Sequence, residues 1–257
     1  MRISANLGFL WTDLPLPEAI RAAGRAGFDA VECHFPYSVD PTAVKTALND
    51  AGLPMLALNT DKADGMGLAA VPKRASEART LIDQAIDYAT SVDADMVHVM
   101  AGFADGPVAG AIFVDNLLHA LDRVEGTDIT LLIEPLNAID APGYYLNNTE
   151  QAANIISAIG SNKLRLMFDC YHVQITEGDL KRRLSDLLPI IGHVQIASVP
   201  DRGEPDHGEV DYPDIVSHLA TIGYTGDIGA EYRPRTTTDD DLGWLPAIRA
   251  AARLSGE

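Results

Sequence analysis

Residues 129–135, ITLLIEP, decide the interpretation of this chain, because an apolar run of strand type ends there in a carboxylate, Glu134. Three later segments have the same form: LRLMFDCYH at 164–172 with Asp169, GHVQIAS at 192–198 with Gln195, and DIGAEYRP at 227–234 with Glu231. The four side chains are separated by 35, 26 and 36 residues. One strand and one helix of an eight-unit barrel take roughly 30 residues. The spacing therefore predicts one oxygen-bearing side chain at the carboxyl end of each strand.

Short apolar runs of strand type alternate with helical patterns along the chain. The predicted strands are 2–7, 28–33, 54–59, 95–100, 129–134, 164–169, 192–197 and 227–231. The predicted helices are 16–26, 41–51, 73–92, 111–125, 149–160, 179–188, 212–222 and 238–254. This alternation, with strands that are apolar almost throughout, is typical of a closed parallel barrel. We predict an α/β fold: a single (β/α)8 TIM barrel that covers residues 1–257 as one domain.

Local signals mark the ends of the helices. Asp40 and Asn148 are predicted N-caps for helices that start at Pro41 and Thr149. The acidic stretch TTTDDDLG at 236–243 is predicted to be the charged start of the last helix. An open, doubly wound sheet is the alternative architecture, and it is ranked lower because no GxGxxG motif follows the first strand.

The charge and the cysteines narrow the class of protein. With 19 basic and 37 acidic residues the formal charge is −18, which repels nucleic acids and anionic membranes. Cys33 and Cys170 are too few for a disulfide scaffold. We find neither a secretory signal nor an apolar run long enough to span a bilayer. We expect a soluble cytoplasmic protein, and a homo-oligomer is compatible with the exposed helices of such a barrel.

The predicted convergence of Glu134, Asp169, Gln195 and Glu231 indicates a metal site. Each of them alone could be a helix cap, an ion-pair partner or a solvated residue. Three carboxylates and an amide aimed at one point, however, need a cation between them. Four oxygen ligands without histidine or cysteine favour Mg²⁺ or Mn²⁺ over Zn²⁺, and they leave about two octahedral positions for a substrate.

Further polar residues are predicted near the same level of the barrel. His172 could donate a hydrogen bond to a substrate oxygen, and Asp140 could hold a substrate hydroxyl. Arg202, which we rank first, and Arg233 are candidate clamps for the substrate carboxylate, because guanidinium binds carboxylate in a bidentate manner. Arg235 is expected to form a surface ion pair instead. The roles of four more residues stay open: His34, His98, His207 and Glu209.

At these residues the chain resembles the hydroxypyruvate isomerase family, within the superfamily of xylose isomerase-like barrels. The segments that carry the resemblance are VECHFPY at 31–37, VHVMAG at 97–102, IEPLNAIDAPGYYLNNTEQA at 133–152, FDCYHVQITEGDL at 168–180, HVQIASVPDRGEPDHGEVDYP at 193–213 and GAEYRPR at 229–235. The resemblance implies a barrel with one divalent metal held by Glu134, Asp169, Gln195 and Glu231. It also implies that Glu134 and Glu231 form the proton-transfer pair, with His172 and Arg202 near the substrate.

Several functions are compatible with this resemblance. The expected reaction interconverts hydroxypyruvate and tartronate semialdehyde through an enediolate, a step of carbohydrate metabolism. The alternatives are a 2-oxo-tetronate isomerase and a ketose 3-epimerase. Gln195 stands where sugar epimerases usually carry histidine, which favours the hydroxypyruvate isomerase branch. A DNA-repair endonuclease would need a basic face and a histidine-rich zinc cluster, neither of which is visible. A metal-dependent module that binds a sugar acid without turnover is the last alternative.

Overall fold

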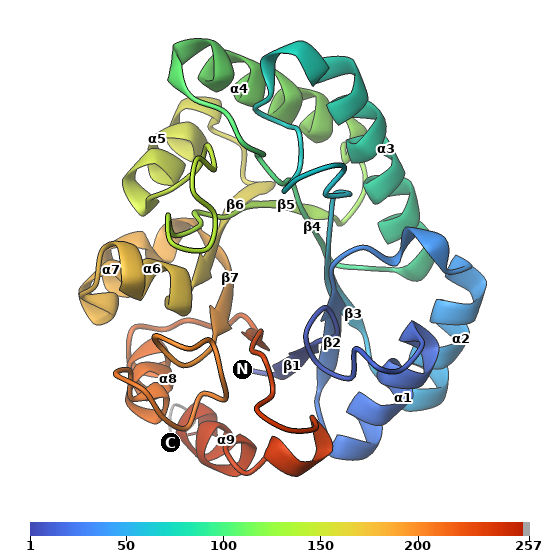
Figure 1. Ribbon diagram of the computed structural model, residues 1–257, viewed down its shortest axis with the longest axis vertical. Helices are drawn as coiled ribbons and strands as arrows, with labels where there is room; N and C mark the ends of the chain where they lie inside the picture. The colour runs from blue at the N-terminus through green and yellow to red at the C-terminus, as the bar shows by residue number, and fades with distance from the viewer. Residues whose placement is uncertain (254–257) are drawn as a thin grey trace.

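The computed structural model describes residues 1–253 and forms a closed barrel of eight parallel strands in chain order, ringed by helices (Figure 1). The strands are β1 Ile3–Asn6, β2 Ala30–Cys33, β3 Met55–Asn59, β4 Met96–His98, β5 Thr130–Ile133, β6 Leu164–Asp169, β7 Ile191–Ile196 and β8 Ile228–Ala230. The helices are α1 Leu16–Ala26, α2 Pro41–Ala51, α3 Ala75–Val92, α4 Gly106–Arg123, α5 Thr149–Ile159, α6 Cys170–Thr176, α7 Leu180–Leu187, α8 Tyr212–Thr221 and α9 Leu245–Arg253. The predicted (β/α)8 barrel is confirmed. The predicted ends of the last helix and of the domain, residues 254 and 257, lie outside the described residues, and the single-domain span stays a prediction.

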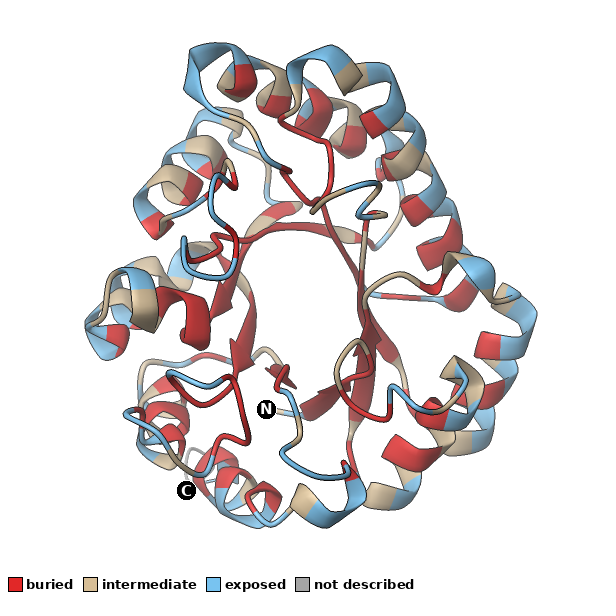
Figure 2. Ribbon diagram, viewed as in Figure 1, coloured by how far each residue is buried: buried red, intermediate tan, exposed pale blue. Residues whose placement is uncertain are grey.

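The barrel closes because β1 pairs in parallel with both β2 and β8. Successive side chains of a strand point to opposite faces, so Leu132 and Met167 share the inward face with Glu134 and Asp169, two residues further on. These two apolar side chains belong to a separate buried cluster formed by strand residues. Figure 2 shows the buried strands at the centre and helices that are buried on their inner sides. Polar site residues are thus stacked above an apolar plug at one end of the barrel.

The predicted N-caps are confirmed. The Asp40 carboxylate accepts a 2.9 Å hydrogen bond from the Thr42 N–H, and the Asn148 side chain accepts one of 2.8 Å from the Gln151 N–H. Each cap pairs a backbone donor that the first helical turn leaves without a partner. Among the described residues no helix is both long and apolar enough to cross a bilayer.

Two predicted helix starts were wrong, and one helix was not predicted. α4 starts at Gly106 rather than 111, because Pro107 fits the first turn of a helix. The acidic stretch 236–243 does not begin the last helix: it forms a loop with a short 3-10 turn at Asp239–Asp241, in which Thr236 donates to Asp241. α6 was missed, because it follows β6 without a loop and is capped by the strand's own last residue, Asp169.

Candidate active site

The carboxyl ends of the strands surround a cavity of about 230 Å³. The long connections after β3, β5 and β7 contribute to its wall, as is usual at the catalytic face of a barrel. Its lining residues combine aromatic, acidic and basic side chains: Phe9, His34, Phe35, Asn59, Lys62, Gly65, Met66, His98, Met100, Glu134, Leu136, Asp140, His172, Arg202, Glu231 and Arg233. Six of the eight predicted site residues line this cavity, with Arg233 exposed among them, whereas Asp169 and Gln195 are not part of its lining.

Three carboxylates are buried at this end of the barrel. Glu134 directly follows β5, Asp169 ends β6 and Glu231 directly follows β8, and they are 6%, 1% and 8% exposed. Burial, with the neighbouring charges of Glu231 and Asp169, raises the pKa of Glu134 well above its usual range. Burial also raises the pKa of Asp169 to about 7, although the Arg202 charge opposes this. In the metal-free protein both carboxyl groups therefore favour the neutral form more than an exposed carboxyl group does.

Glu231 behaves in the opposite way. Burial alone would raise its pKa, but contact with His34 and the charge of Arg202 lower that pKa to about 2. The His34 Nε2 atom lies 3.6 Å from Oε1 of Glu231. The Asn6 amide, at the end of β1, donates a 2.9 Å hydrogen bond to Oε2. Glu231 is therefore the carboxylate of this site that is held ionised.

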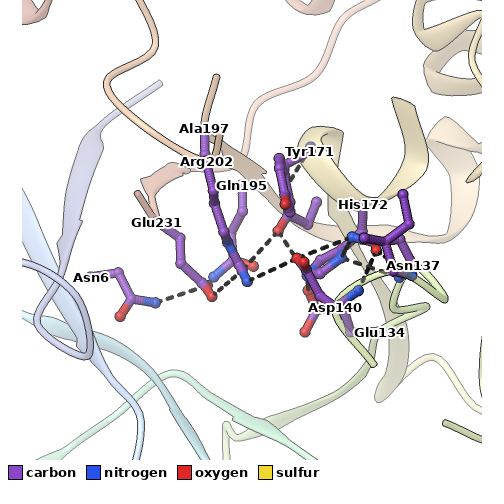
Figure 3. Close-up of polar contacts among 12 residues, drawn as sticks. Asn6, Glu134, Asn137, Asp140, Tyr171, His172, Gln195, Ala197, Arg202 and Glu231 are labelled. Carbon is purple, nitrogen blue, oxygen red and sulfur yellow. Dashed lines mark hydrogen bonds and ion pairs between the residues drawn. The ribbon is translucent and has the colours of Figure 1, made fainter. Parts of the chain in front are cut away.

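Arg202 is the cation that compensates these carboxylates. Its Nη2 donates a 2.8 Å hydrogen bond to Oε1 of Glu231 and lies 3.5 Å from Oδ2 of Asp169. Figure 3 shows the Arg202 side chain reaching between Glu231 on one side and Asp140 on the other, whose carboxylate is 3.9 Å from Nη1. The residue is 8% exposed and adopts a left-handed backbone conformation with φ 56°, which costs a non-glycine residue about 1–2 kcal/mol. Its guanidinium is already engaged by the protein.

His172 is a hydrogen-bond donor toward the carboxylates. Its Nδ1 accepts a 3.2 Å hydrogen bond from the backbone N–H of Asn137, so the neutral ring carries its proton on Nε2. Burial and the Arg202 charge lower the pKa of His172 to about 3, which keeps the ring neutral. Nε2 lies 3.6 Å from Oδ2 of Asp169 and 4.0 Å from Oε1 of Glu134. A substrate oxygen placed between these groups would receive its N–H.

His98 faces Glu134 from the end of β4. Its Nδ1 is 3.5 Å from Oε2 of Glu134, and neither ring nitrogen has a hydrogen-bond partner among the described residues. Burial lowers the pKa of His98 to about 4. His34 and His98, whose roles the sequence left open, therefore both belong to the cavity wall, one beside each glutamate.

Gln195 lies one strand away from Asp169, with which it is paired in register between β6 and β7. The side chain is 1% exposed, and its Oε1 finds no partner within residues 1–253. Oε1 of Glu134 is likewise buried and unpaired there. Such orphaned oxygens cost free energy unless something binds them. They fit a hard divalent cation, which takes oxygen ligands of this kind.

The geometry does not bring the four predicted ligands equally close. Glu134, Asp169 and His172 offer ligand atoms within 4.8 Å of one another, whereas Glu231 is drawn away toward Arg202 and Asn6. The Nε2 proton of His172 makes this ring a donor rather than a ligand in the tautomer that Asn137 selects. Among the three predicted carboxylate ligands, Glu134 and Asp169 are thus the pair that already lie together.

The remaining predicted residues divide between the cavity and the surface. Asp140 lines the cavity, and hydrogen bonds from Tyr171 and Asn137 outweigh its partial burial and lower its pKa. The Arg233 guanidinium lies 5.5 Å from the centre of the Phe9 ring. Arg235 pairs with the buried carboxylate of Glu204, which agrees with its expected structural role.

His207 and Glu209, whose roles were left open, lie in the loop after β7 and are absent from the cavity lining. His207 contacts Asp201 and Asp206, each at 2.9 Å, and Glu209 accepts a 3.0 Å hydrogen bond from Gln174. These contacts tie the loop to itself and to α6. They indicate a structural role.

Sequence reasoning missed three polar residues that shape this end of the barrel: Asn6, Glu32 and Lys62. Asn6 and Glu32 stand near the ends of the first two strands, the same position that identified the later four. The signal was therefore present at both residues. Lys62 comes from the loop after β3, where no pattern marks it.

Comparisons with known proteins agree with this architecture. Residues 20–248 match the family model of xylose isomerase-like TIM barrels. The chain is 40% identical to 2-oxo-tetronate isomerase of Cupriavidus necator, over 95% of this chain and 97% of that one. It is 34% identical to hydroxypyruvate isomerase of Escherichia coli, over 97% of this chain and 100% of that one. A crystal structure described as AP endonuclease, family 2, from Brucella melitensis superposes with a TM-score of 0.92 at 36% identity, covering 95% of this chain and 98% of that one.

Proposed function

This chain belongs to the xylose isomerase-like TIM barrel family, and from that premise we propose that it is a metal-dependent isomerase that interconverts hydroxypyruvate and tartronate semialdehyde. One observation carries the proposal. Three buried carboxylates, Glu134, Asp169 and Glu231, lie at the carboxyl ends of three strands, and two of them, Glu134 and Glu231, line one cavity. A group of buried carboxylates of this kind fits a site that holds a divalent cation and moves protons.

We propose that Glu134, Asp169, Gln195 and Glu231 hold one divalent cation, with Mg²⁺ or Mn²⁺ as the best match to oxygen donors. The unpaired oxygens of Glu134 and Gln195 support this ligand set. When bound, such a cation supplies polarisation of the substrate's carbonyl and hydroxyl oxygens.

The two glutamates would move the proton. One glutamate would remove a proton from one substrate carbon, and the other would return a proton to the neighbouring carbon, since both side chains line the same cavity. The hydroxyl proton of the substrate passes to the former carbonyl oxygen, and exchange with water returns both glutamates to their starting protonation. The two roles exchange in the reverse direction. An enediolate of the substrate lies between the two transfers, and the Nε2–H of His172 is aimed where it can donate to an enediolate oxygen.

The substrate carboxylate needs a cation that the protein does not already use. Arg202 is engaged by Glu231 and Asp169, so it suits the charge balance and orientation of these two groups. Arg233 lines the cavity and forms no ion pair with a carboxylate of the described chain, so we assign it the substrate carboxylate. Asp140, at the same wall, would accept a hydrogen bond from a substrate hydroxyl.

Longer substrates are the alternative within the same chemistry. The relative from Cupriavidus necator is a 2-oxo-tetronate isomerase, and a ketose 3-epimerase would use the same pair of glutamates.

A DNA-repair endonuclease function has less support. The Brucella melitensis structure is described as an AP endonuclease, but a formal charge of −18 disfavours a DNA-binding face here. The metal-capable group found within the described chain contains one histidine, where a multi-zinc centre needs several. Tight binding to duplex DNA with an abasic site would revive this reading, and metal-dependent ligand binding without turnover would instead support a binding module.

The cellular compartment of the enzyme is also part of the proposal. Cys33 and Cys170 are both free and buried, which suits a reducing compartment, and we propose the cytoplasm. A homo-oligomer stays open.

Proton NMR of hydroxypyruvate in D₂O with the purified protein tests the function. With Mg²⁺ present we expect enzyme-accelerated formation of tartronate semialdehyde that carries deuterium, and no acceleration after chelation. Glu231→Gln should fold normally and lose turnover, whereas Glu209→Gln, an exposed control outside the cavity, should stay active. If hydroxypyruvate is not converted but a four-carbon keto acid or a ketose is, the alternatives replace the proposal. Near-normal activity of Glu231→Gln would refute the proton-transfer assignment.

A further inference from the structure

A fourth carboxylate, Glu32, is buried inside the barrel and takes no part in the proposed proton transfer or substrate binding. It is 2% exposed at β2. It accepts hydrogen bonds from Ser4 Oγ at 2.9 Å and from Gln195 Nε2 at 3.0 Å, and His193 Nε2 contacts it at 3.2 Å. A buried carboxylate is tolerated when donors of this number surround it. The protein therefore provides Glu32 with a specific set of hydrogen-bond partners inside the barrel.

Four neighbouring strands cooperate to make room for Glu32. Ser4 comes from β1, Glu32 from β2, and His193 and Gln195 from β7. Between them, β8 contributes Gly229, whose absent side chain matters. A Cβ at this residue would lie 2.1 Å from Oε1 of Glu32 and 2.8 Å from Nε2 of His193. Any larger residue at 229 would displace the Glu32 carboxylate, so glycine at this position leaves the space that the carboxylate occupies.

Glu32 decides which way the Gln195 amide faces. The NH₂ group of Gln195 is the end that meets Glu32, because Nε2 donates to Oε2 of the carboxyl group at 3.0 Å. The carbonyl oxygen, Oε1, then faces away from Glu32, and it is the atom without a partner among the described residues. Gln195 is paired in register with Asp169 on β6 and with Gly229 on β8, at the level of the proposed ligands. In Figure 3 its side chain points toward the same centre as those of Glu231 and Arg202.

We propose that Glu32 is a positioning residue that fixes the Gln195 amide so that its oxygen is presented to the divalent cation. The inference rests on the metal site of the proposed function. Glu32 would act through Gln195 and not by contact with the ion. It also gives a reason for an amide at 195: a carboxylate there would face the Glu32 carboxylate with no proton between them. His193 supplies the second donor that balances the buried charge.

An exchange of donor and acceptor tests this arrangement. Mn²⁺ affinity is measured by calorimetry for the wild type, Glu32→Gln, Gln195→Glu and the double variant that carries both changes. In Glu32→Gln the amide at 195 is no longer forced to face one way, and we expect affinity to fall roughly 10- to 100-fold, the range for groups that orient a ligand. Gln195→Glu should also bind Mn²⁺ more weakly or fold poorly. The double variant restores one donor and one acceptor, so it should recover affinity to near the wild-type value.

Ser185→Ala is the control, because it removes an exposed hydroxyl on α7 that contacts neither Glu32 nor Gln195, and its affinity should stay near that of the wild type. A merely structural role of Glu32 would not produce recovery in the double variant. Equal affinity of Glu32→Gln and wild type, or a double variant no better than either single one, overturns the inference.

A wild-type crystal structure with Mn²⁺ covers the case in which the variants do not fold. There we expect Oε1 of Gln195 on the ion and Nε2 on Glu32, and a Gln195 turned from either partner overturns the inference. Failure of the wild type to bind Mn²⁺ at all would instead count against the proposed metal site, so the two failures are distinguishable.

Discussion

Arg202 donates a 2.8 Å hydrogen bond to Glu231 from a nearly buried position, and the same Nη2 lies 3.5 Å from Asp169. One guanidinium is thus shared between carboxylates from two strands. Its charge holds Glu231 ionised and restrains the rise in the pKa of Asp169. The first prediction follows from this relationship.

Arg202→Met should destabilise the metal-free protein by about 3–5 kcal/mol at pH 7, because it leaves buried carboxylates without their cation. Glu231 has a lowered pKa of about 2, so its stabilising contribution is present above its ordinary pKa and is lost as the pH falls toward 2. The difference between wild type and variant should therefore shrink between pH 5 and pH 3. Urea denaturation with a chelator present measures it, and a difference that is the same at both pH values would contradict the explanation.

Arg233→Met should raise KM for hydroxypyruvate roughly 10- to 100-fold with a smaller change in kcat, because a charged hydrogen bond to a ligand contributes about 1.5–3 kcal/mol. Steady-state kinetics provide the measurement. Lys73→Met is the control, since it removes the same charge from an exposed site outside the cavity. If the two variants behave alike, Arg233 acts only through the overall charge and does not bind the carboxylate.

Divalent metal should raise the stability of the folded chain by linkage. At a free Mn²⁺ concentration of 100 times the dissociation constant, the expected gain is about 2.7 kcal/mol. Asp169→Asn should remove most of this gain while it keeps the α6 cap, because asparagine also accepts the hydrogen bond from the Tyr171 N–H. Thermal unfolding with and without Mn²⁺ measures the effect. Asp122→Asn, at an exposed helix residue, should respond to Mn²⁺ as the wild type does.

The loop after β7 should be most stable in mildly acidic solution. Hydrogen bonds with Asp201 and Asp206 raise the pKa of His207, so its contribution is complete below its ordinary pKa and is lost as the pH rises through the raised one. Burial opposes the shift at Asp201, but hydrogen bonds from His207 and Ser198 lower its pKa to about 2, so its contribution is lost only as the pH falls toward 2. The window lies between about pH 4 and pH 6.5.

His207→Gln tests this window by comparison of unfolding free energies at pH 5 and pH 9. The loss should be below about 1 kcal/mol, because these side chains are largely exposed, and it should be greater at pH 5. A larger loss at pH 9 would show that the ion pair is not the cause.

The alternation of strand and helix, and the polar side chain that ends each late strand, were readable from the sequence because they depend on local patterns. Apolar runs predict buried strands, and caps such as Asp40 and Asn148 predict where helices begin. The start of the last helix was misplaced because a tertiary contact outweighs the local signal there: Thr238 accepts a hydrogen bond from the Trp11 N–H, which holds the acidic stretch in a loop.

Tertiary structure alone decided the electrostatic environment and the contacts of each site residue. Glu134 and Glu231 are the same residue type at equivalent strand ends, yet burial beside like charges raises the pKa of one, whereas Arg202 and His34 lower that of the other. Glu32 reaches Gln195 across 163 residues of sequence because β2 and β7 face each other through the gap that Gly229 leaves. No local sequence pattern predicts this contact, because it forms only when the sheet closes into a barrel.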